Sequence, residues 1–541
     1  MNDEQARHLH VVPTEPEEPL ALAIAEDTAG VIGVDPLEPQ VSSSQPEPPG
    51  APHMGVAEVK RLAVRGVAAL AIRTVGVRMM TFTGNVLLAR LLAPKTFGLF
   101  AIVNFIVAIA SFLADLGIGA ALIQRREELT EEDMRTAFTL GLFIDTAFTA
   151  AIFLLAPVLV HLYHLDSRYV LAIRVLSMTI MFSTFGTIPS IKLERKLQFT
   201  RASMADVASQ LVYTAIAVTL AFKGLHVWAF VIASITSRAL DAVLLNVMAF
   251  WRPRIGFTKA SAKRLLVFGL PYQATGLIVQ IKDNFVPTFI AFAGGATAVG
   301  YLNWAVGLAA TPLFLVTIVS RITFPTYARL QHELEELKDA IEQSIRWISA
   351  TVFPGVFMIM ALASPIVHNL YGDKWRPALP AFYFLCIPIM ASSYSTVIVS
   401  ALYGLGRAKQ VLRLTIIWTI AGWGLGVPMT LAWGFTGFAA ALAIVSSLSL
   451  LAVYEIRKVI DLRFARMQIR LMAMAALPSL GVWIAAPRVV HSVATLGAVG
   501  IAGGCVYVFI LFITGEIGDA RRLLKETVRA RIGEPEVTPG A

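Results

Sequence analysis

From about residue 66 to residue 514 the chain repeats one pattern, in which a run of apolar residues is followed by a short polar break. An α-helix needs about 20 consecutive apolar residues to cross a bilayer, and each run meets that length. Unpaired backbone groups are costly in hydrocarbon, so such runs must be helices. The pattern predicts about fourteen spans, which begin near residues 66, 97, 136, 169, 201, 226, 264, 297, 346, 378, 411, 435, 468 and 491.

The composition agrees with a membrane protein, because 56% of the residues are hydrophobic and only 15% are charged. Two cysteines, Cys386 and Cys505, lie far apart within apolar runs, so neither a disulfide framework nor a thiolate metal site is expected. The net charge of +9 could suggest nucleic-acid binding, but the bases lie at the ends of apolar runs rather than along one soluble face. We therefore expect no nucleic-acid partner, no metal and no cofactor.

The polar breaks alternate in charge along the chain. Arg125, Arg126 and Arg135 follow the second span, whereas the breaks at 293–298 and 433–436 contain no base. Basic loops stay on the cytoplasmic side of a membrane protein. This alternation predicts that both termini are cytoplasmic, which requires an even number of spans.

A different composition marks the beginning of the chain, and a weak repeat divides the rest. Residues 1–55 are acidic and rich in proline, which favours a disordered cytoplasmic tail. The stretches FGLFAIVNFIV and VGYLNWAVGLA resemble each other at an offset of 202 residues, which suggests two six-helix halves. We expect an all-α polytopic fold with these parts: an N-lobe at 56–260, a C-lobe at 261–462, a further helix pair at 463–514 and a basic cytoplasmic tail at 515–541.

Several charged residues fall inside the predicted spans. A charge at mid-membrane costs at least about 2.5–3.5 kcal/mol, so it should face a polar cavity or a partner. Two interpretations remain open: Asp241 neutralises Arg238 three positions away, or the bases line a cavity that binds an anion such as a phosphate. Arg90 lies near a helix end, where its side chain can instead reach the interface. The candidate anion-binding residues are Arg78, Arg90, Arg174, Arg238 and Lys282, and the candidates for coupling to H⁺ or Na⁺ are Asp115, Asp241 and Asp283.

Helix breakers and missing motifs narrow the mechanism. Pro271, Pro287 and Pro312 are expected to interrupt spans seven and eight, and the glycines at 422–426 with Pro428 to break span eleven, which would supply hinges. No GxxxxGK[ST] sequence is present, so the chain is not a P-loop ATPase. No long aqueous loop is available for an active site, so catalysis is not expected.

Several stretches together resemble the bacterial oligosaccharide flippases of the polysaccharide-export family, in the multidrug, oligosaccharidyl-lipid and polysaccharide transporter superfamily. The resemblance covers nearly the whole membrane region and lies in LARLLAPKTFGLFAIV (88–103), FLADLGIGAALIQRREELTEED (112–133), LAIRVLS (171–177), KLERKLQFTR (192–201), WRPRIGF (251–257), KRLLVFGLP (263–271), FPTYARLQ (324–331), YGDKWRPALPAF (371–382) and YGLGRAKQVLRL (403–414).

This resemblance implies a two-lobed helical fold with a central cavity. It implies alternating-access transfer of a polyprenyl-diphosphate-linked oligosaccharide across the bacterial inner membrane, for exopolysaccharide or O-antigen assembly. Membrane lipids, a polysaccharide polymerase and chain-length or export proteins would be its partners. Arg90, Asp115 and Arg174 lie within the matching stretches. Asp283 corresponds to an acidic position of the family, but Asn284 to Thr288 depart from the family's pattern there.

Two other functions remain as alternatives. A drug or organic-cation antiporter of the same superfamily would have more acids than bases in its cavity, whereas the sequence places more bases within the spans. A membrane enzyme or a scaffold of a polysaccharide assembly complex is the third possibility, and transfer of labelled sugar by the purified protein would identify an enzyme.

Overall fold

The computed structural model describes residues 76, 79–124, 127, 129–196, 198–313, 316, 327 and 330–515, without the side chains of 199 and 275–288. These residues form helices and no strand, and eleven helices among them are long and apolar enough to span a bilayer. The protein is thus an all-helical, multi-pass membrane protein. The count is below the predicted fourteen for three reasons: the first span begins outside the described residues, the seventh includes undescribed side chains, and spans eleven and twelve join directly at Trp433 and Gly434, where the backbone is non-helical, and so count as one.

The helices follow each other with short connections. The first described helix covers residues 79–91. The next are α3 (Pro94–Asp115), α4 (Ile118–Gln124), α5 (Glu131–Leu162), α6 (Tyr169–Arg195), α7 (Phe199–Phe222), α8 (Val227–Met248), α9 (Lys259–Ala309) and η1 (Thr311–Leu313). The remaining ones are α11 (Leu334–Ile366), η2 (Val367–Tyr371), η3 (Asp373–Ala378), α12 (Leu379–Gly404), α13 (Ala408–Ser446), η4 (Ser447–Ser449), α14 (Leu450–Arg457), α15 (Phe464–Val489) and α16 (Val493–Ile513).

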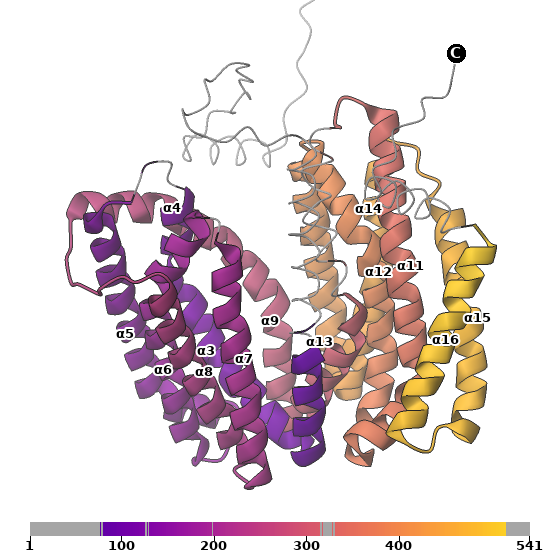
Figure 1. Ribbon diagram of the computed structural model, residues 1–541, viewed down its shortest axis with the longest axis horizontal. Coiled ribbons are helices and arrows are strands. Elements are labelled where there is room, and N and C mark those ends of the chain that lie inside the picture. Colours follow the sequence, from indigo (N-terminus) through magenta and orange to yellow (C-terminus); the bar gives the residue numbers. More distant parts are fainter. Residues whose placement is uncertain are drawn as a thin grey trace, which may run out of the picture. The chain divides into compact units, whose positions relative to one another are not determined.

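The helices before α9 pack on one another, and so do those after it. Helix α6 contacts α5 and α8, and α8 contacts α7 (Figure 1). In the second half of the chain α11 contacts α12 and α15, α12 contacts α13, and α15 contacts α16. Helix α9 connects the two sets, because it packs on α3 and also on α12 and α13. The predicted domain boundary at 260 falls at the start of α9 and that at 462 between α14 and α15, and both remain predictions.

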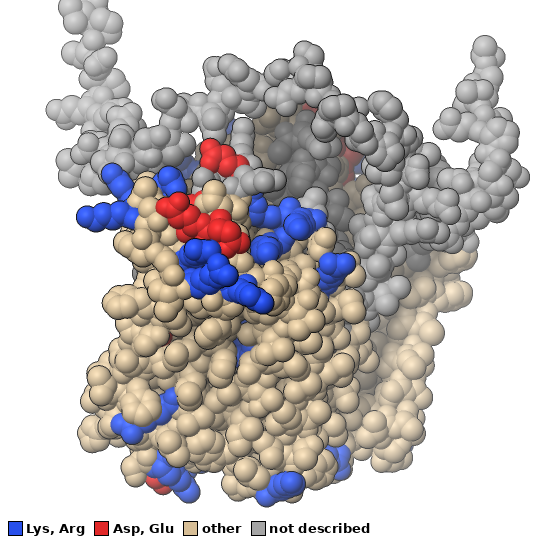
Figure 2. Space-filling model, turned by 60° about the vertical axis from the view of Figure 1, so that its left-hand side comes forward, with Lys and Arg blue, Asp and Glu red and all other residues tan. Residues whose placement is uncertain are grey.

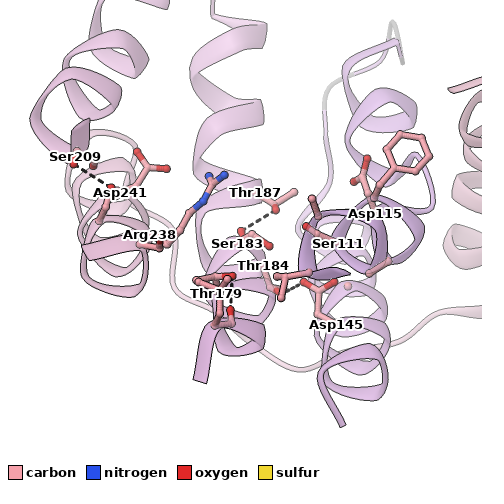
Figure 3. Close-up of a pocket in the computed structure, with 18 of the residues that line it drawn as sticks. Ser111, Asp115, Asp145, Thr179, Ser183, Thr184, Thr187, Ser209, Arg238 and Asp241 are labelled. Carbon is pink, nitrogen blue, oxygen red and sulfur yellow. Dashed lines mark hydrogen bonds between the residues drawn. The ribbon is translucent and has the colours of Figure 1, made fainter. Parts of the chain in front are cut away.

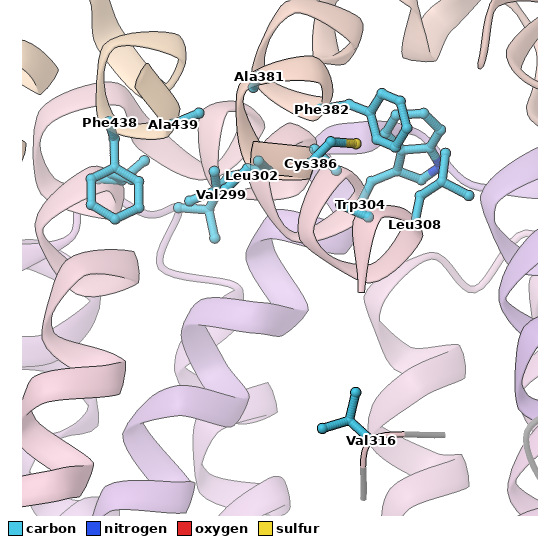
Figure 4. Packing of buried hydrophobic residues seen from close by; sticks show 14 of the residues in the cluster. Val299, Leu302, Trp304, Leu308, Val316, Ala381, Phe382, Cys386, Phe438 and Ala439 are labelled. Atoms are coloured by element: carbon cyan, nitrogen blue, oxygen red, sulfur yellow. The ribbon is translucent and has the colours of Figure 1, made fainter. Parts of the chain in front are cut away.

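Apolar packing holds the last part of α9 against the second half of the chain. Trp304 is 8% exposed and packs against Phe382 of α12, with ring centroids 6.5 Å apart. Val299 and Leu302 belong to the same cluster as Cys386 of α12 and Phe438 of α13 (Figure 4). Cys386 is thus a buried packing residue, as its apolar surroundings in the sequence indicated, whereas Cys505 is exposed.

Two long helices change direction, but not at the predicted prolines. Helix α9 continues through Pro271, and its non-helical backbone lies at Gly295 (φ 69°, ψ −177°). Helix α13 continues through the glycines at 422–426 and Pro428, and bends at Trp433 and Gly434. The prediction of breaks at Pro271 and Pro428 is therefore wrong, because neighbouring helix turns accommodate a membrane proline. Pro312 lies in η1, just after α9 ends; the side chain of Pro287 lies outside the description.

Helices α3 and α9 touch backbone to backbone at two glycines. A Cβ atom added to Gly98 would lie 1.6 Å from the carbonyl oxygen of Ala296, and one added to Gly300 would lie 2.0 Å from that of Pro94. Small residues allow membrane helices such a close approach. The two contacts are reciprocal: Gly98 and Gly300, like Pro94 and Ala296, differ by the 202 positions of the sequence repeat.

Charged side chains concentrate at one end of the helices. Figure 2 shows the larger gathering of Lys and Arg side chains, with acids between them, over one end of the molecule; smaller basic groups lie at the opposite end, and the surface between the two ends is largely uncharged. The end at which α6 finishes is here called the Arg195 end; the opposite one, at which α3 begins, is the Pro94 end. Arg252 and Arg254 are exposed in the segment that joins α8 to α9 at the Arg195 end, and so is Lys259 at the start of α9.

Candidate functional site

A polar cavity of about 880 Å³ lies among the helices of the first half of the chain. It is lined by residues of α3 to α8, at the middle of the helices and toward the Arg195 end. The polar side chains in its wall are Asn104, Ser111, Asp115, Asp145, Thr179, Ser183, Thr184, Thr187, Asp206, Ser209, Gln210, Tyr213, Ser234, Ser237, Arg238 and Asp241. Such a polar wall inside a membrane bundle requires water or a polar ligand.

Arg238 contributes the positive charge of this wall. It lies near the middle of α8, and Figure 3 shows its side chain reaching between Asp241 on one side and Asp115 on the other. Asp241 is three residues further along the helix, yet no ion pair within 4.0 Å forms between them, and the Arg238 guanidinium has no hydrogen-bond partner among the described residues. The two side chains still attract each other electrostatically, so partial neutralisation by Asp241 remains a prediction, but no direct contact occupies the guanidinium. The five guanidinium donors remain free for a ligand.

Asp145 lies in the same wall but is deeply buried. Its side chain is 7% exposed and accepts a hydrogen bond from the Thr184 hydroxyl of α6. Burial of a carboxylate is costly without a donor, so Thr184 is the residue that permits Asp145 to face the interior. Asp145 is a charge within an apolar run of the sequence, but the sequence does not reveal its surroundings, because the donor comes from another helix.

Asp241 and Ser209 face each other across α7 and α8 (Figure 3). The Oδ1 atom of Asp241 and the Oγ atom of Ser209 are buried without a hydrogen-bond partner among the described residues. Ser237 of α8 bonds the Ser209 carbonyl oxygen at 2.9 Å and holds α7 close to α8 at this level. This side of the cavity therefore has unused hydrogen-bonding capacity.

The cavity continues toward the Arg195 end. A second space of about 400 Å³ shares Asp115, Arg238 and Asp241 with the first and adds Glu194 of α6 and Tyr272 of α9. Glu194 is adjacent to the last residue of α6. The two spaces together thus lead from the middle of the helices to the Arg195 end.

Side chains fasten the segments around this end of the bundle. Arg195 donates to the carbonyl oxygens of Leu122 (2.7 Å) and Glu127 (2.6 Å), which holds α4 and the segment after it against α6. Asp133, which is 1% exposed, accepts hydrogen bonds from Ser261 at 2.8 Å and Arg264 at 3.2 Å. The start of α9 is thereby fixed to the start of α5.

The other predicted anion-binding residues lie elsewhere. Arg90 is the residue before the last of the helix 79–91 and donates to the Asn369 carbonyl oxygen at 2.7 Å. Arg174 donates to the Phe153 carbonyl oxygen at 3.0 Å, and its guanidinium carbon lies 4.4 Å from the centre of the Phe153 ring. Neither is among the residues that line the cavity. Arg78 and the side chains of Lys282 and Asp283 lie outside the described residues.

The charge balance of the cavity differs from the expectation that bases would lead. Among the described lining residues, Asp115, Asp145, Asp206 and Asp241 accompany a single base, Arg238. The expectation was wrong for these residues because counting charges per span does not show which face of a helix each occupies. Arg90 and Arg174 face carbonyl groups outside the cavity.

Comparison with known families places the chain among polysaccharide biosynthesis proteins. The model of the family described as "polysaccharide biosynthesis protein" matches residues 87–380, which is more than half of the chain. The lipopolysaccharide biosynthesis protein WzxC of Escherichia coli (strain K12) is 25% identical over 363 residues, or 66% of this chain and 73% of that protein. The succinoglycan biosynthesis transport protein ExoT of Rhizobium meliloti (strain 1021) is 24% identical over 354 residues, or 65% of this chain and 70% of that protein.

Two solved structures share the fold. The lipid II flippase MurJ in an inward closed conformation has a TM-score of 0.67 at 14% identity, with 83% of this chain and 99% of that chain covered. An inward-facing multidrug resistance transporter of the MATE family has a TM-score of 0.54 at 17% identity, with 74% and 98% covered. At these sequence identities, the two structures show that the fold is shared and nothing more.

Proposed function

The chain belongs to the polysaccharide biosynthesis protein family, and from this we propose that it is a transporter that moves a polyprenyl-diphosphate-linked oligosaccharide across the bacterial inner membrane. The family match supports this proposal, as do relatives named for lipopolysaccharide biosynthesis and for succinoglycan transport. A flippase changes no covalent bond of its cargo, so the protein needs no catalytic group. The product would serve exopolysaccharide or O-antigen assembly.

The free guanidinium of Arg238 carries this proposal. It lies in the cavity without an ion pair or hydrogen bond to any described residue, although Asp241 is close by on the same helix. A diphosphate presents several charged oxygens to which a guanidinium can donate two parallel hydrogen bonds. A cavity of about 880 Å³ is within the size of ligand sites and would hold the diphosphate with the first sugars. The lipid tail would remain outside, in the membrane.

The acids of the cavity fit a coupling role in this proposal. Diphosphate binding to Arg238 would bring negative charge close to Asp115, Asp145 and Asp241, so H⁺ or Na⁺ uptake by these acids would favour cargo binding. Asp241 Oδ1 and Ser209 Oγ, which have no hydrogen-bond partner among the described residues, are available to bind the proton or Na⁺. Asp283 remains a candidate for the same coupling role, and only the sequence supports it.

We infer the orientation of the protein in the membrane from the distribution of its bases. Along the chain, polar breaks rich in bases alternate with breaks poor in bases, and basic loops stay in the cytoplasm. We therefore take the Arg195 end and both termini as cytoplasmic. The cavity would then open toward the cytoplasm, the side on which lipid-linked precursors are made. The two lobes would then rock against each other, so that the cavity opens first to one side of the membrane and then to the other. This alternating access would carry the headgroup across.

Replacement of Arg238 tests the proposal. Purified protein in liposomes would receive a short-chain, fluorescent polyprenyl-diphosphate sugar, and its appearance in the opposite leaflet would be followed by quenching. We expect Arg238→Ala to lower the transfer rate by about tenfold or more, since a charge-assisted bidentate contact contributes about 1.5–3 kcal/mol. Arg238→Lys should retain an intermediate rate.

Lys223 offers a matched control, because it is an exposed base at the end of α7 that does not line the cavity. Lys223→Ala should transfer cargo at the parent rate. Equal transfer by Arg238→Ala and the parent protein would refute diphosphate binding by Arg238.

A second function is favoured by one observation, the excess of acids in the cavity. Four aspartates against one arginine among the described lining residues would suit an organic cation. Efflux of a cationic dye by the same liposomes, abolished by Asp145→Asn but unaffected by Arg238→Ala, would establish the antiporter. We favour the flippase because an unpaired arginine in the cavity would repel a cationic cargo.

A further inference from the structure

The helix that precedes α3 is joined to the second half of the chain by three reciprocal hydrogen bonds at the Pro94 end. The Nε1 atom of Trp375 donates to the Ala89 carbonyl oxygen at 2.9 Å, and the Nζ atom of Lys374 donates to the Arg90 carbonyl oxygen at 2.8 Å. In the opposite direction, Arg90 donates to the Asn369 carbonyl oxygen at 2.7 Å. We call these three side chains and the carbonyls that they bond, from residues 89–90 and 369–375, the clasp.

The clasp supplies what a helix end lacks. The last carbonyl groups of a helix have no partner within it, and burial without one is costly. The helix 79–91 obtains donors for two of these carbonyls from η3, which is about 280 positions away in the sequence. Separation of the two segments in the membrane would therefore leave the carbonyls unpaired unless water enters.

Aromatic packing surrounds the Trp375 part of the clasp, whereas the hydrogen bonds of Arg90 and Lys374 are exposed. Trp375 is fully buried, and its ring contacts Phe97 of α3 with centroids 5.3 Å apart and Trp304 of α9 at 5.6 Å. Tyr371 packs edge-on against Trp304 at 5.2 Å. The Gly98 and Gly300 contact closes α3 on α9 at the same end. Trp375 thus contacts both the first and the second half of the chain.

The positions of the cavity and the clasp are complementary. The cavity extends from the middle of the helices to Glu194 at the Arg195 end, whereas the clasp lies at the Pro94 end. We propose that the clasp is the outer gate: its three hydrogen bonds and the Trp375 contacts seal the cavity from the periplasm, and they must separate before cargo leaves. This assignment rests on the proposed function for its direction, since it takes the Pro94 end as periplasmic.

The gate can be tested without any cargo. A single cysteine at Thr179, which lines the cavity, would serve as a reporter in a full-length chain carrying Cys386→Ala and Cys505→Ala. A membrane-impermeant maleimide would be added to spheroplasts to label from outside, and to inverted vesicles to label from inside. Parent protein should label fast in inverted vesicles and slowly in spheroplasts.

Weakening the clasp should raise labelling from outside. Trp375→Phe keeps an aromatic ring but removes the indole donor, and Lys374→Met removes the other donor. Each should raise the spheroplast rate about fivefold, the effect of one lost hydrogen bond on the open population. Arg376→Ala is the matched control, because Arg376 pairs with Asp373 of its own segment at 2.9 Å and takes no part in the clasp.

The outcomes separate the two proposals. Unchanged spheroplast labelling in both Trp375→Phe and Lys374→Met, with both proteins monodisperse on size exclusion, would overturn the gate. Fast labelling of parent protein from outside would also overturn it. Faster labelling of both variants in spheroplasts, together with absence of lipid-linked sugar transfer in liposomes, would retain the gate and refute the proposed cargo.

Discussion

At the scale of single residues, Thr184 determines whether Asp145 is tolerated inside the bundle. The hydroxyl of Thr184 is the donor to a carboxylate that is 7% exposed. Thr184→Val keeps the side-chain shape but leaves the acceptor unpaired, so we expect it to lower the free energy of unfolding by about 1–3 kcal/mol. Thermal unfolding in detergent would measure this loss.

Removing both partners provides the control. In an Asp145→Leu background, Thr184→Val should lower the free energy of unfolding by less, because no unpaired carboxylate remains. The effects of substitutions at two residues in contact do not add. An identical loss in both backgrounds would show that the hydrogen bond to Asp145 is not what Thr184 contributes.

The same residues show how far sequence reasoning reaches at this scale. Arg238 could be singled out because a base at mid-span needs a polar partner or cavity, and the structure places it in one. The pairing of Asp145 with Thr184 could not be predicted, because a threonine in an apolar run is ordinary and its helical phase relative to α5 depends on tertiary packing. Arg174 was assigned to the cavity, but a carbonyl and a ring on α5 hold it elsewhere.

At the scale of helices, Gly295 allows α9 to change direction without a loop. Its backbone (φ 69°, ψ −177°) lies in a region that is almost restricted to glycine, and a Cβ there would meet no atom within 4 Å. Gly295→Ala should thus destabilise the protein through backbone strain alone, by about 1–3 kcal/mol. The midpoint of thermal unfolding would report the change.

Gly307 is the matched control in the same helix. A Cβ added there would likewise meet no atom within 4 Å, but the backbone of Gly307 is not in the positive-φ region. Gly307→Ala should be neutral or stabilising, by up to about 1 kcal/mol. If both alanine variants unfolded at the parent temperature, the special role of Gly295 would be disproved.

Sequence patterning predicted the helices and the places where the two long helices turn, but not which residues act as hinges. The breaks at 293–298 and 433–436 were recognised between apolar runs, and the backbone turns at Gly295 and Gly434 within them. Prolines were chosen as hinges from their missing N–H group, yet α9 and α13 continue through Pro271 and Pro428. A single positive-φ glycine has a larger geometric effect, but nothing in the sequence separates it from the other glycines of these helices.

At the scale of the whole molecule, orientation and lobe boundaries remain predictions from charge and repeat patterns. The reciprocal glycine contact bears on the repeat: residues 94 and 98 meet residues 296 and 300, and each pair is separated by the same 202 positions. Two equivalent segments related by a two-fold axis meet at that axis through the same residues from each side. A faint sequence match and a close contact, which are independent observations, therefore point to the same internal symmetry.

This symmetry predicts equal sensitivity of Gly98 and Gly300 to substitution. An added methyl group at either one would overlap a backbone carbonyl that cannot rotate away, so α3 and α9 must separate. We expect Gly98→Ala and Gly300→Ala each to lower the free energy of unfolding by about 1–3 kcal/mol. The double variant should lose less than the sum, because one separation relieves both overlaps. Gly119→Ala in α4, where a Cβ meets nothing within 4 Å, controls for helix propensity. Normal unfolding of one glycine variant beside strong destabilisation by the other would contradict a two-fold relation between the halves.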